Sequence, residues 1–391
     1  SRIRKTESLS FVIVVVVDSS AGRRLAVEWR GRRVCAWVPA PLGQRDLRVS
    51  TATARAAERA VAALRLSDAN LPARFEPLAR LLLRHEGVAS SGIEGLREPI
   101  ESVLVAEKTG TGGTAGWIAD NLAVIDRALG SATEPLSVAA LHDWHRRLMR
   151  HGRLPEHLVG AFRPSLGWVG GSSPLDAAYV PPPPREVPRL MDDLLRFADS
   201  RSELDAVSRA ALVHAQFEAI HPYGDGNGRL GRVLVSRALR REGATRRATA
   251  PISAAIVRDP GGYLSGLRMF EQGDANAWVR WFAETAMRAA ATTEHLVEQA
   301  SHLLAQWVEL VADLRSDHSA RALLEHLPAA PVLSAADVSA RVGVSERSGL
   351  AALRALSDRG ILTPLTGVPA GRPGRARHWF AATGLLDLWK P

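Results

Sequence analysis

The chain has 391 residues, 46% of them apolar, and a formal net charge of +9 that is carried almost entirely by arginine. This length and apolar content predict two or three domains with substantial cores. The single cysteine, Cys35, excludes an intrachain disulfide and a cluster of thiolate ligands. The excess of arginine favours nucleic acid or acidic partners, but a general compositional bias explains it equally well.

Residues 1–50 form a basic extension that we expect to be rich in strands. Basic residues followed by the apolar run 11–17 imitate the start of a signal peptide, but this run is short for one and too short to span a membrane. A buried strand is the better interpretation, and with 25–29 and 34–38 it predicts a small sheet over residues 10–40. We expect a cytoplasmic protein with no membrane contact.

Helical spacing of apolar residues predicts that most of the remaining chain is α-helical. We expect helices near 52–66, 74–89, 136–150, 186–198, 203–220, 228–241 and 274–312. After the second of these, Ser90 and Glu94 stand four residues apart and share one face if the helix continues. Gly95 follows, as at many helix ends, so by itself this is an ordinary terminus.

The segment 167–184 has turn glycines between two short β-prone runs and ends in four prolines. The pattern predicts a short hairpin. The proline run is also compatible with a stiff connector or a protein ligand.

The most informative stretch is HPYGDGNGRLGR, residues 221–232. Pro222 cannot continue the preceding helix, which places His221 at or just past its end. A second helix is expected from Asn227 or Gly228, and its first N–H groups and dipole suit an anion. Glycines allow a ligand to approach the backbone closely. They are Gly224, Gly226 and Gly228.

The polar side chains of this stretch suit a polyphosphate and an attacking hydroxyl. His221 can accept a proton at neutral pH, and Asp225 is a hard oxygen ligand for Mg²⁺. Asn227 can donate to a phosphate oxygen, and the guanidinium groups of Arg229 and Arg232 share a helix face and match phosphate oxygens. The set is typical of phosphoryl or nucleotidyl transfer.

Other phosphate-binding motifs are excluded. The sequence has no G-x-x-x-x-G-K-[ST] loop and no kinase H-R-D or D-F-G set. Lysine occurs only at Lys5, Lys108 and Lys390, so arginine and backbone must hold the phosphate.

Residues 316–391 follow a pattern of their own. Ser334 and Ser345 are expected N-caps, and Gly360 is expected just past a helix end. A hairpin with an arginine-rich turn at 371–378 follows. The order resembles a winged helix-turn-helix, for which DNA binding and protein contact are equally favoured. Its helices are expected at 320–327, 334–342 and 345–359.

The stretch 221–232 resembles the signature of the Fic family, H-P-F-x-[D/E]-G-N-G-R-x-x-R, with Tyr223 replacing the usual Phe. The resemblance implies a mainly helical fold and transfer of AMP from ATP to a Tyr, Thr or Ser hydroxyl. It implies that His221 is the general base and Asp225 the Mg²⁺ ligand. Intact glycines in the signature favour AMP transfer over phosphorylation. The implied nucleotide-binding residues are Gly224, Gly226, Asn227, Gly228, Arg229 and Arg232.

Upstream, Ser90, Glu94 and Gly95 resemble the family's inhibitory motif, [S/T]-x-x-x-E-[G/N]. The resemblance implies that Glu94 pairs with Arg232 and leaves ATP misaligned for attack. In some relatives the same glutamate also helps to remove AMP.

Three further segments share the resemblance. The segment 167–184 resembles the flap that docks the target protein, and Gly160, Phe162 and Arg163 resemble a recurring segment before it. Tyr263 lies in a segment that resembles one flanking the adenine.

We therefore expect a mainly α protein with a Fic-type helical core at 51–315 that includes a β-hairpin flap. A small β extension at 1–50 precedes the core, and a winged helix-turn-helix at 316–391 follows it. The leading function is self-inhibited AMP transfer from ATP, with Mg²⁺, to a target protein or to the enzyme itself. The alternative is a DNA-binding regulator whose core senses a nucleotide or modifies only itself. The identity of the target and assembly into a homo-oligomer stay open.

Overall fold

The computed structural model describes residues 14–45, 47–72, 76–200, 203–366 and 378–388. They form two compact units, each assembled from segments that are far apart in the sequence. Unit 1 consists of Ser1–Ala63, Ala123–Ala244 and Ala255–Met287. Unit 2 consists of Leu64–Leu122, Thr245–Ala254 and Arg288–Pro391. The segment boundaries expected near residues 50 and 315 stay predictions.

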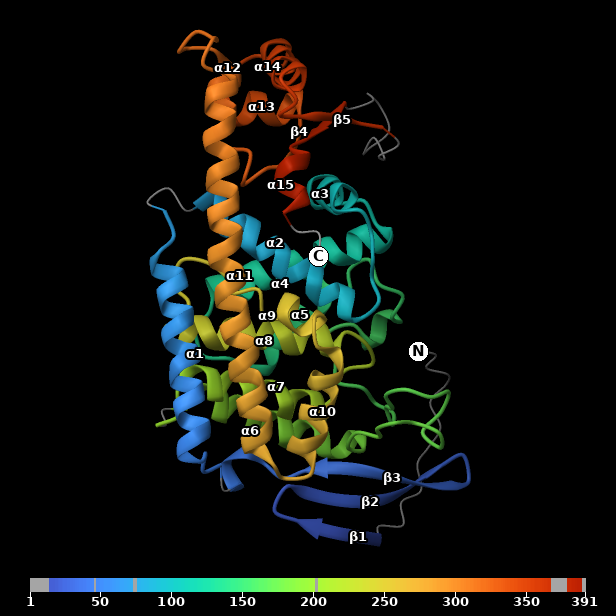
Figure 1. Cartoon of the computed structure of the whole chain (residues 1–391). Helices are drawn as coiled ribbons and strands as arrows, with labels where there is room; N and C mark the ends of the chain where they lie inside the picture. Colours follow the sequence, from blue (N-terminus) through green and yellow to red (C-terminus); the bar gives the residue numbers. More distant parts are fainter. Residues whose placement is uncertain (1–13, 46, 73–75, 201–202, 367–377, 389–391) are drawn as a thin grey trace. The chain divides into compact units, whose positions relative to one another are not determined.

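Helices dominate both units, as expected, and Figure 1 labels most of them. Unit 1 contains β1 (Val14–Ser19), β2 (Gly22–Trp29), β3 (Arg32–Pro39), α5 (Val138–Leu148), α6 (Val187–Asp199), α7 (Ala206–Ile220), α8 (Asn227–Arg241), α10 (Pro260–Glu271) and short 3₁₀ turns at Leu42–Gln44, Glu156–Leu158 and Pro184–Glu186. Unit 2 contains α2 (Glu76–Ile93), α3 (Ile100–Thr109), α12 (Ser319–Leu324), β4 (Val332–Ser334), α13 (Ala335–Val342), α14 (Glu346–Asp358), β5 (Thr363–Leu365), β6 (Trp379–Ala381) and α15 (Thr383–Asp387). Helices that contribute residues to both units are α1 (Thr51–Ala69), α4 (Gly113–Gly130), α9 (Ile252–Val257) and α11 (Ala275–Leu310).

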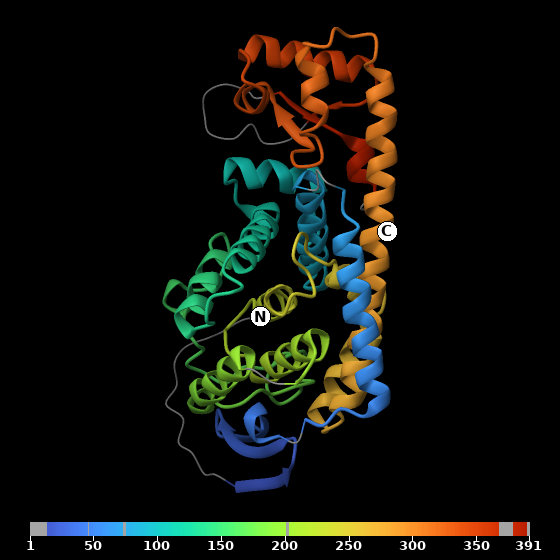
Figure 2. The ribbon, with the colours of Figure 1, turned by 90° about the vertical axis from the view of Figure 1, so that its left-hand side faces the viewer.

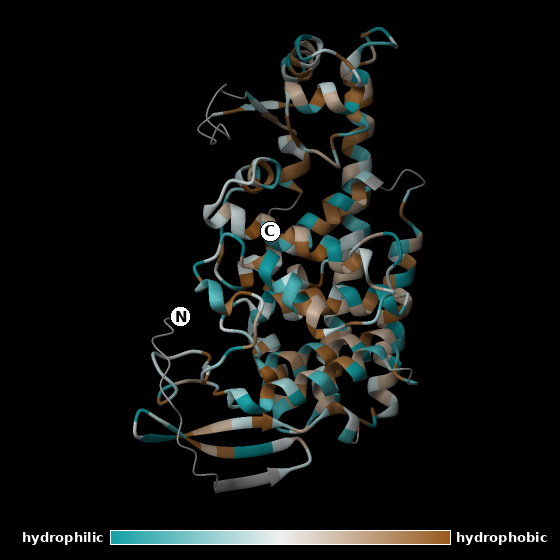
Figure 3. Ribbon diagram, turned by 180° about the vertical axis from the view of Figure 1, so that it is seen from behind, coloured by the Kyte–Doolittle hydropathy of each residue, from teal (hydrophilic) through white to brown (hydrophobic). Residues whose placement is uncertain are grey.

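The small N-terminal sheet is confirmed. Its antiparallel strands lie in the order β1-β2-β3, and the pairs Leu25↔Ala36 and Val27↔Val34 lie on one face. These four side chains are buried, whereas the alternate positions are more exposed, because successive strand residues point to opposite faces. Figure 3 shows brown, hydrophobic stretches and teal, hydrophilic ones in this sheet. Figure 2 shows the dark blue sheet below the green helices of the same unit.

The core of unit 1 is built around α7, in which nearly every side chain is buried. Small alanines let neighbouring elements approach, and the indole Nε1 of Trp278 donates to the carbonyl oxygen of Ala211 at 2.8 Å. Asp205 caps the start of α7 by accepting from the backbone N–H groups of Val207 and Ser208. This buried helix is the rigid support of the stretch that follows it.

Unit 2 has a core of its own, to which Leu78 and Leu81 of α2 contribute. Its small sheet has the order β4-β6-β5. The expected N-caps Ser334 and Ser345 are confirmed, as is the position of Gly360 just past the end of α14. The winged helix-turn-helix itself stays a prediction, because residues 371–377 of its expected wing lie outside the described residues. Of the helices described, none is long and apolar enough to cross a membrane.

Candidate functional site

Residues 221–226 form the turn between α7 and α8, and 227–232 begin α8, as predicted. His221 ends α7 in the left-handed conformation, with φ of 48°, and its N–H donates to the carbonyl oxygen of Phe217 at 2.9 Å. Gly226, with φ of 76°, precedes α8. A glycine has no side chain that could cap the first N–H groups of α8, so these groups suit an anion. The same helix carries the buried side chains of Arg229 and Arg232, which are 5% and 2% exposed.

The side chain of Asn227 holds the turn together. Its Oδ1 accepts from the N–H of Tyr223 at 2.9 Å, and its Nδ2 donates to the carbonyl oxygen of the same residue at 2.8 Å. These bonds use the oxygen and one of the two N–H groups of the amide. The phosphate contact expected of Asn227 stays a prediction, for which its second side-chain N–H and its backbone N–H are the donors.

Arg163 ties the turn to the segment before the flap. Its Nε donates to the carbonyl oxygen of His221 at 2.8 Å, and its own N–H donates to that of Pro222 at 2.9 Å. The guanidinium also reaches the carbonyl oxygens of Pro182 and Ser165, at 2.5 and 3.0 Å. Burial lowers its pKa to about 10, which leaves it charged at neutral pH. Arg163 is the positioning residue whose role the sequence alone did not supply.

The flap is anchored to the last turn of α7, next to His221. Val169 and Tyr179 form a β-bridge, so the expected hairpin is present only as this isolated pair. The phenol of Tyr179 donates to the carbonyl oxygen of Ala219 at 2.6 Å. This carbonyl belongs to the last turn of α7, two residues before His221, so the flap and the histidine share one support.

His145 supports the turn from α5. The N–H of Gly160 donates to its Nδ1 at 2.8 Å, so Nε2 carries the proton and donates to the carbonyl oxygen of Asp225 at 3.1 Å. Burial lowers the pKa of His145 to about 4 and keeps the ring neutral. Tyr223 stacks on this ring, and its hydroxyl finds the partner expected for a buried phenol in His142, at 3.1 Å.

Glu218 is a residue that the sequence analysis missed. Its carboxylate lies 4.0 Å from Nδ1 of His221 and 3.9 Å from Nδ1 of His214. A Cβ at Gly231 would lie 2.4 Å from Oε1 of Glu218, so only glycine leaves room for the carboxylate. The spacing of three residues between Glu218 and His221 on a helix was the available signal.

Comparisons with known proteins agree with this geometry. Residues 135–239, which include α5, α7 and most of α8, match the sequence model of the Fic/DOC family. The chain contains a Fic domain. A protein of Aquifex aeolicus named "probable protein adenylyltransferase" is 35% identical over 97 residues, 25% of this chain and 28% of that protein. Protein adenylyltransferase Fic of Drosophila erecta is 31% identical over 151 residues, 38% of this chain and 28% of that protein. The chain thus spans under a third of these relatives.

Solved structures support the fold over a longer range. A Fic family protein from Desulfovibrio desulfuricans superposes with a TM-score of 0.52 and 20% identity, covering 85% of this chain and 97% of that one. Fic-1 of C. elegans superposes with a TM-score of 0.50 and 19% identity, covering 63% of this chain and 74% of that one. At these identities the similarity shows the fold alone, which is the Fic helical fold.

Tyr263 has a packing role in unit 1. The ring is 6% exposed and lies against Trp278 and Trp281, and its hydroxyl is 2.9 Å from Nε2 of His214. The adenine contact expected from the sequence stays a prediction that these contacts do not support.

The residues of the inhibitory motif lie in unit 2. Helix α2 ends at Ile93, Glu94 follows it, and Gly95 has φ of 79°. The end of α2 is held by Asn121, whose Nδ2 donates to the carbonyl oxygen of Gly87 at 3.0 Å and to Oγ of Ser91 at 3.2 Å. The motif is therefore fixed to a well-packed helix.

Asp225 is the one carboxylate of the signature, and it is exposed. Its Oδ1 accepts from the N–H of Gly226 at 2.7 Å. Among the described residues, no three His, Cys, Asp or Glu side chains gather into a metal site. A single carboxylate fits Mg²⁺ that arrives with a nucleotide, because phosphate and water oxygens complete the coordination.

Proposed function

We propose that this protein transfers AMP from ATP to a Tyr, Thr or Ser hydroxyl of a target protein or of itself. The observation that carries the proposal is the position of His221 at the end of α7, beside the uncapped start of α8. The relatives named protein adenylyltransferases support it.

In this mechanism His221 accepts the proton of the target hydroxyl, whose oxygen then attacks the α-phosphorus. The bond from that phosphorus to the bridging oxygen breaks, and pyrophosphate leaves with the bonding electrons. Glu218 stabilises the imidazolium that His221 becomes, as an acidic partner of a catalytic histidine does. The N–H groups of α8, with Arg229 and Arg232, hold the phosphates, so catalysis rests on positioning and charge neutralisation. Asp225 would hold Mg²⁺, which neutralises phosphate charge.

We further propose that Glu94 inhibits the reaction. A carboxylate that pairs with Arg232 would compete with a phosphate of ATP for the same guanidinium. Ser90, buried near the end of α2, and Gly95 would set the position of Glu94. Removing the carboxylate should therefore activate the enzyme.

The test uses ATP labelled either on the α-phosphate or on the γ-phosphate, Mg²⁺ and a cell lysate. Glu94→Gly should incorporate the α-label into protein but not the γ-label, and Glu94→Gly with His221→Ala should incorporate neither. Incorporation of the γ-label would indicate phosphorylation instead. No incorporation by Glu94→Gly with Mg²⁺ or Mn²⁺ would contradict AMP transfer.

DNA binding by unit 2 is a second candidate. Arg347, Ala351, Arg354 and Asp358 are exposed and lie on one face of α14. A recognition helix of this kind would present its arginines to the major groove and to phosphates. The full chain should then bind duplex DNA with an affinity that falls as salt rises, and Arg347→Glu should weaken it. No binding at low salt would remove this candidate.

A further inference from the structure

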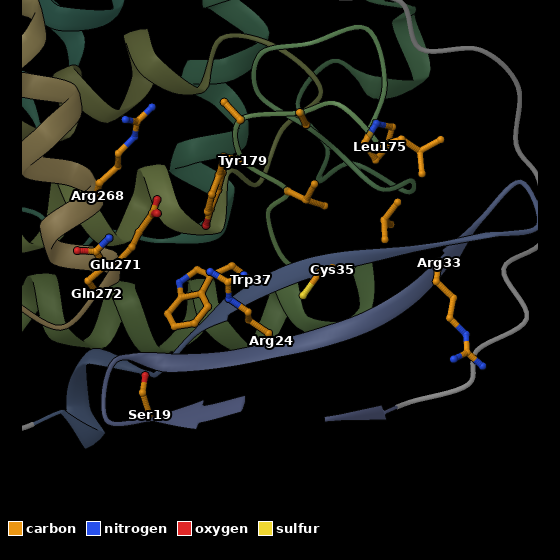
Figure 4. A pocket seen from close by; sticks show the side chains of 15 residues that line it. Ser19, Arg24, Arg33, Cys35, Trp37, Leu175, Tyr179, Arg268, Glu271 and Gln272 are labelled. Atoms are coloured by element: carbon orange, nitrogen blue, oxygen red, sulfur yellow. The ribbon is translucent and has the colours of Figure 1, made fainter. Parts of the chain in front are cut away.

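A cavity with a volume of about 690 Å³ lies in unit 1. Its walls come from β2 and β3, from the flap segment at 174–180, and from α10 (Figure 4). The signature at 221–232 contributes no residue to this lining. The N-terminal sheet has no part in the proposed reaction, but it forms one wall of this cavity.

The sheet also braces the flap. The N–H of Trp37 on β3 donates to the carbonyl oxygen of Val180 at 2.8 Å. The rings of Trp29 and Trp168 meet edge to face, with centroids 6.4 Å apart. Since Tyr179 belongs both to the flap bridge and to the cavity lining, a segment bound along the flap would pass the mouth of the cavity.

The charged side chains that line the cavity are mainly positive. Arg24 of β2, Arg33 of β3 and Arg268 of α10 are exposed and line the cavity. Arg33 lies opposite Glu28 in the strand pair, so Arg24 and Arg268 carry the excess of positive charge. The one lining carboxylate is Glu271, and burial raises its pKa to about 7 although Arg268 and Arg24 act against this. Near neutral pH it offsets only part of the positive charge.

We propose that this cavity binds acidic side chains of the protein segment that lies along the flap. The inference rests on the proposed transfer to a protein hydroxyl and names the chemistry of the favoured target: glutamates or aspartates near the modified residue. Guanidinium groups bind carboxylates with charge-assisted hydrogen bonds. The volume suits a few side chains. A nucleic acid fits less well, because Glu271 would face its repeated phosphates.

Cys35 makes a direct test possible. It is the only cysteine, it is exposed, and it lines the cavity between Arg33 and Trp37. The full chain is treated with iodoacetamide, without nucleotide, and the mass of the intact protein is followed. The probe is a short peptide of glutamates around one serine, and the comparison peptide has lysines instead.

The glutamate peptide should slow the alkylation of Cys35 by about fivefold at saturation, and the lysine peptide should not. Arg24→Glu, and independently Arg268→Glu, should raise by roughly tenfold the concentration of glutamate peptide that gives half of the maximal protection of Cys35. Arg32→Glu is the matched control, because Arg32 is exposed on β3 of the same sheet and is not among the lining residues. It should change that concentration less than about twofold.

Equal slowing by both peptides, slowing by neither, or an equal effect of Arg32→Glu would overturn the proposal. Stronger protection by duplex DNA than by the glutamate peptide would also overturn it, in favour of nucleic acid. Because no ATP is present, a failure of AMP transfer leaves this result standing, and AMP transfer without protection rejects the cavity alone.

Discussion

The Nε of Arg163 donates to the carbonyl oxygen of His221 at 2.8 Å, across 58 residues of sequence. The carbonyl oxygen of a left-handed residue at the end of a helix does not accept a hydrogen bond within the helix, so it needs another donor. The buried guanidinium is that partner, and it also bonds to Pro182 at the base of the flap. One side chain thus fixes both His221 and the flap segment.

Replacing Arg163 with lysine should destabilise the protein by about 2–3 kcal/mol, since a single ammonium cannot span the same carbonyl groups and leaves some buried and unpaired. Urea unfolding measures the loss. Arg196→Lys is the control, because its ion pair with Asp192 is 72% exposed on the arginine side, and it should cost less than about 0.5 kcal/mol. Equal stability of the two variants would show that the network around Arg163 is unimportant.

Tyr179→Phe should release the flap from α7. The lost bond to Ala219 should cost about 1 kcal/mol, because the carbonyl oxygen is left without this donor. Amide hydrogen exchange should become faster at 169–179, while α14 of unit 2 should keep its rate. Unchanged exchange at 169–179 would mean that the phenol does not hold the flap.

Gly231→Ala should impair both stability and AMP transfer. The new Cβ would lie 2.4 Å from Oε1 of Glu218 and 3.0 Å from Nδ1 of His214, so the carboxylate must leave its place near His221. We expect a loss of about 1–3 kcal/mol, as for other overpacked sites. Gly261→Ala is the control, since an added Cβ there would meet open space. Full activity of Gly231→Ala would exclude a role for the position of Glu218.

Stability should fall as the pH is lowered from about 6.5 to 4. The pKa of His145 is about 4 in the folded protein, against the usual 6.5, so the unfolded state takes up the proton first. The neutral His145 ring therefore contributes roughly 2–3 kcal/mol to the free energy of unfolding, and this contribution is complete above pH 6.5. His214, with a pKa of about 3, acts in the same direction. His145→Asn should flatten the dependence in denaturant titrations at several pH values, and an unchanged slope would reject this assignment.

The sequence predicted those parts of the site that depend on neighbours along the chain. Pro222 and the glycines around it determine where α7 ends and α8 begins, so this turn could be expected. The bonds of Arg163 and Tyr179 join residues 58 and 40 positions apart, and no local pattern reports them. The bonds of the Asn227 amide to the backbone of Tyr223 could not be expected either, because that backbone becomes available only in the folded turn.

Other differences have local causes. Helix α10 was not expected, because Pro260 and the two glycines after it are typical of a turn. In the structure Asp259 caps this helix and Pro260 occupies its first position, where a missing N–H costs nothing. The flap forms one bridge rather than two strands, since Asp176 binds the N–H groups of Ser172 and Ser173 and folds the tip into a turn.

The mass of intact Glu94→Gly protein after incubation with ATP and Mg²⁺ tests the central claim most directly, because self-modification reveals donor and reaction together. Beside it, Glu94→Gly with His221→Ala is treated in the same way. The account predicts that the first protein gains the mass of one or more AMP groups and that the second gains none. A gain in neither, or an equal gain in both, would contradict it.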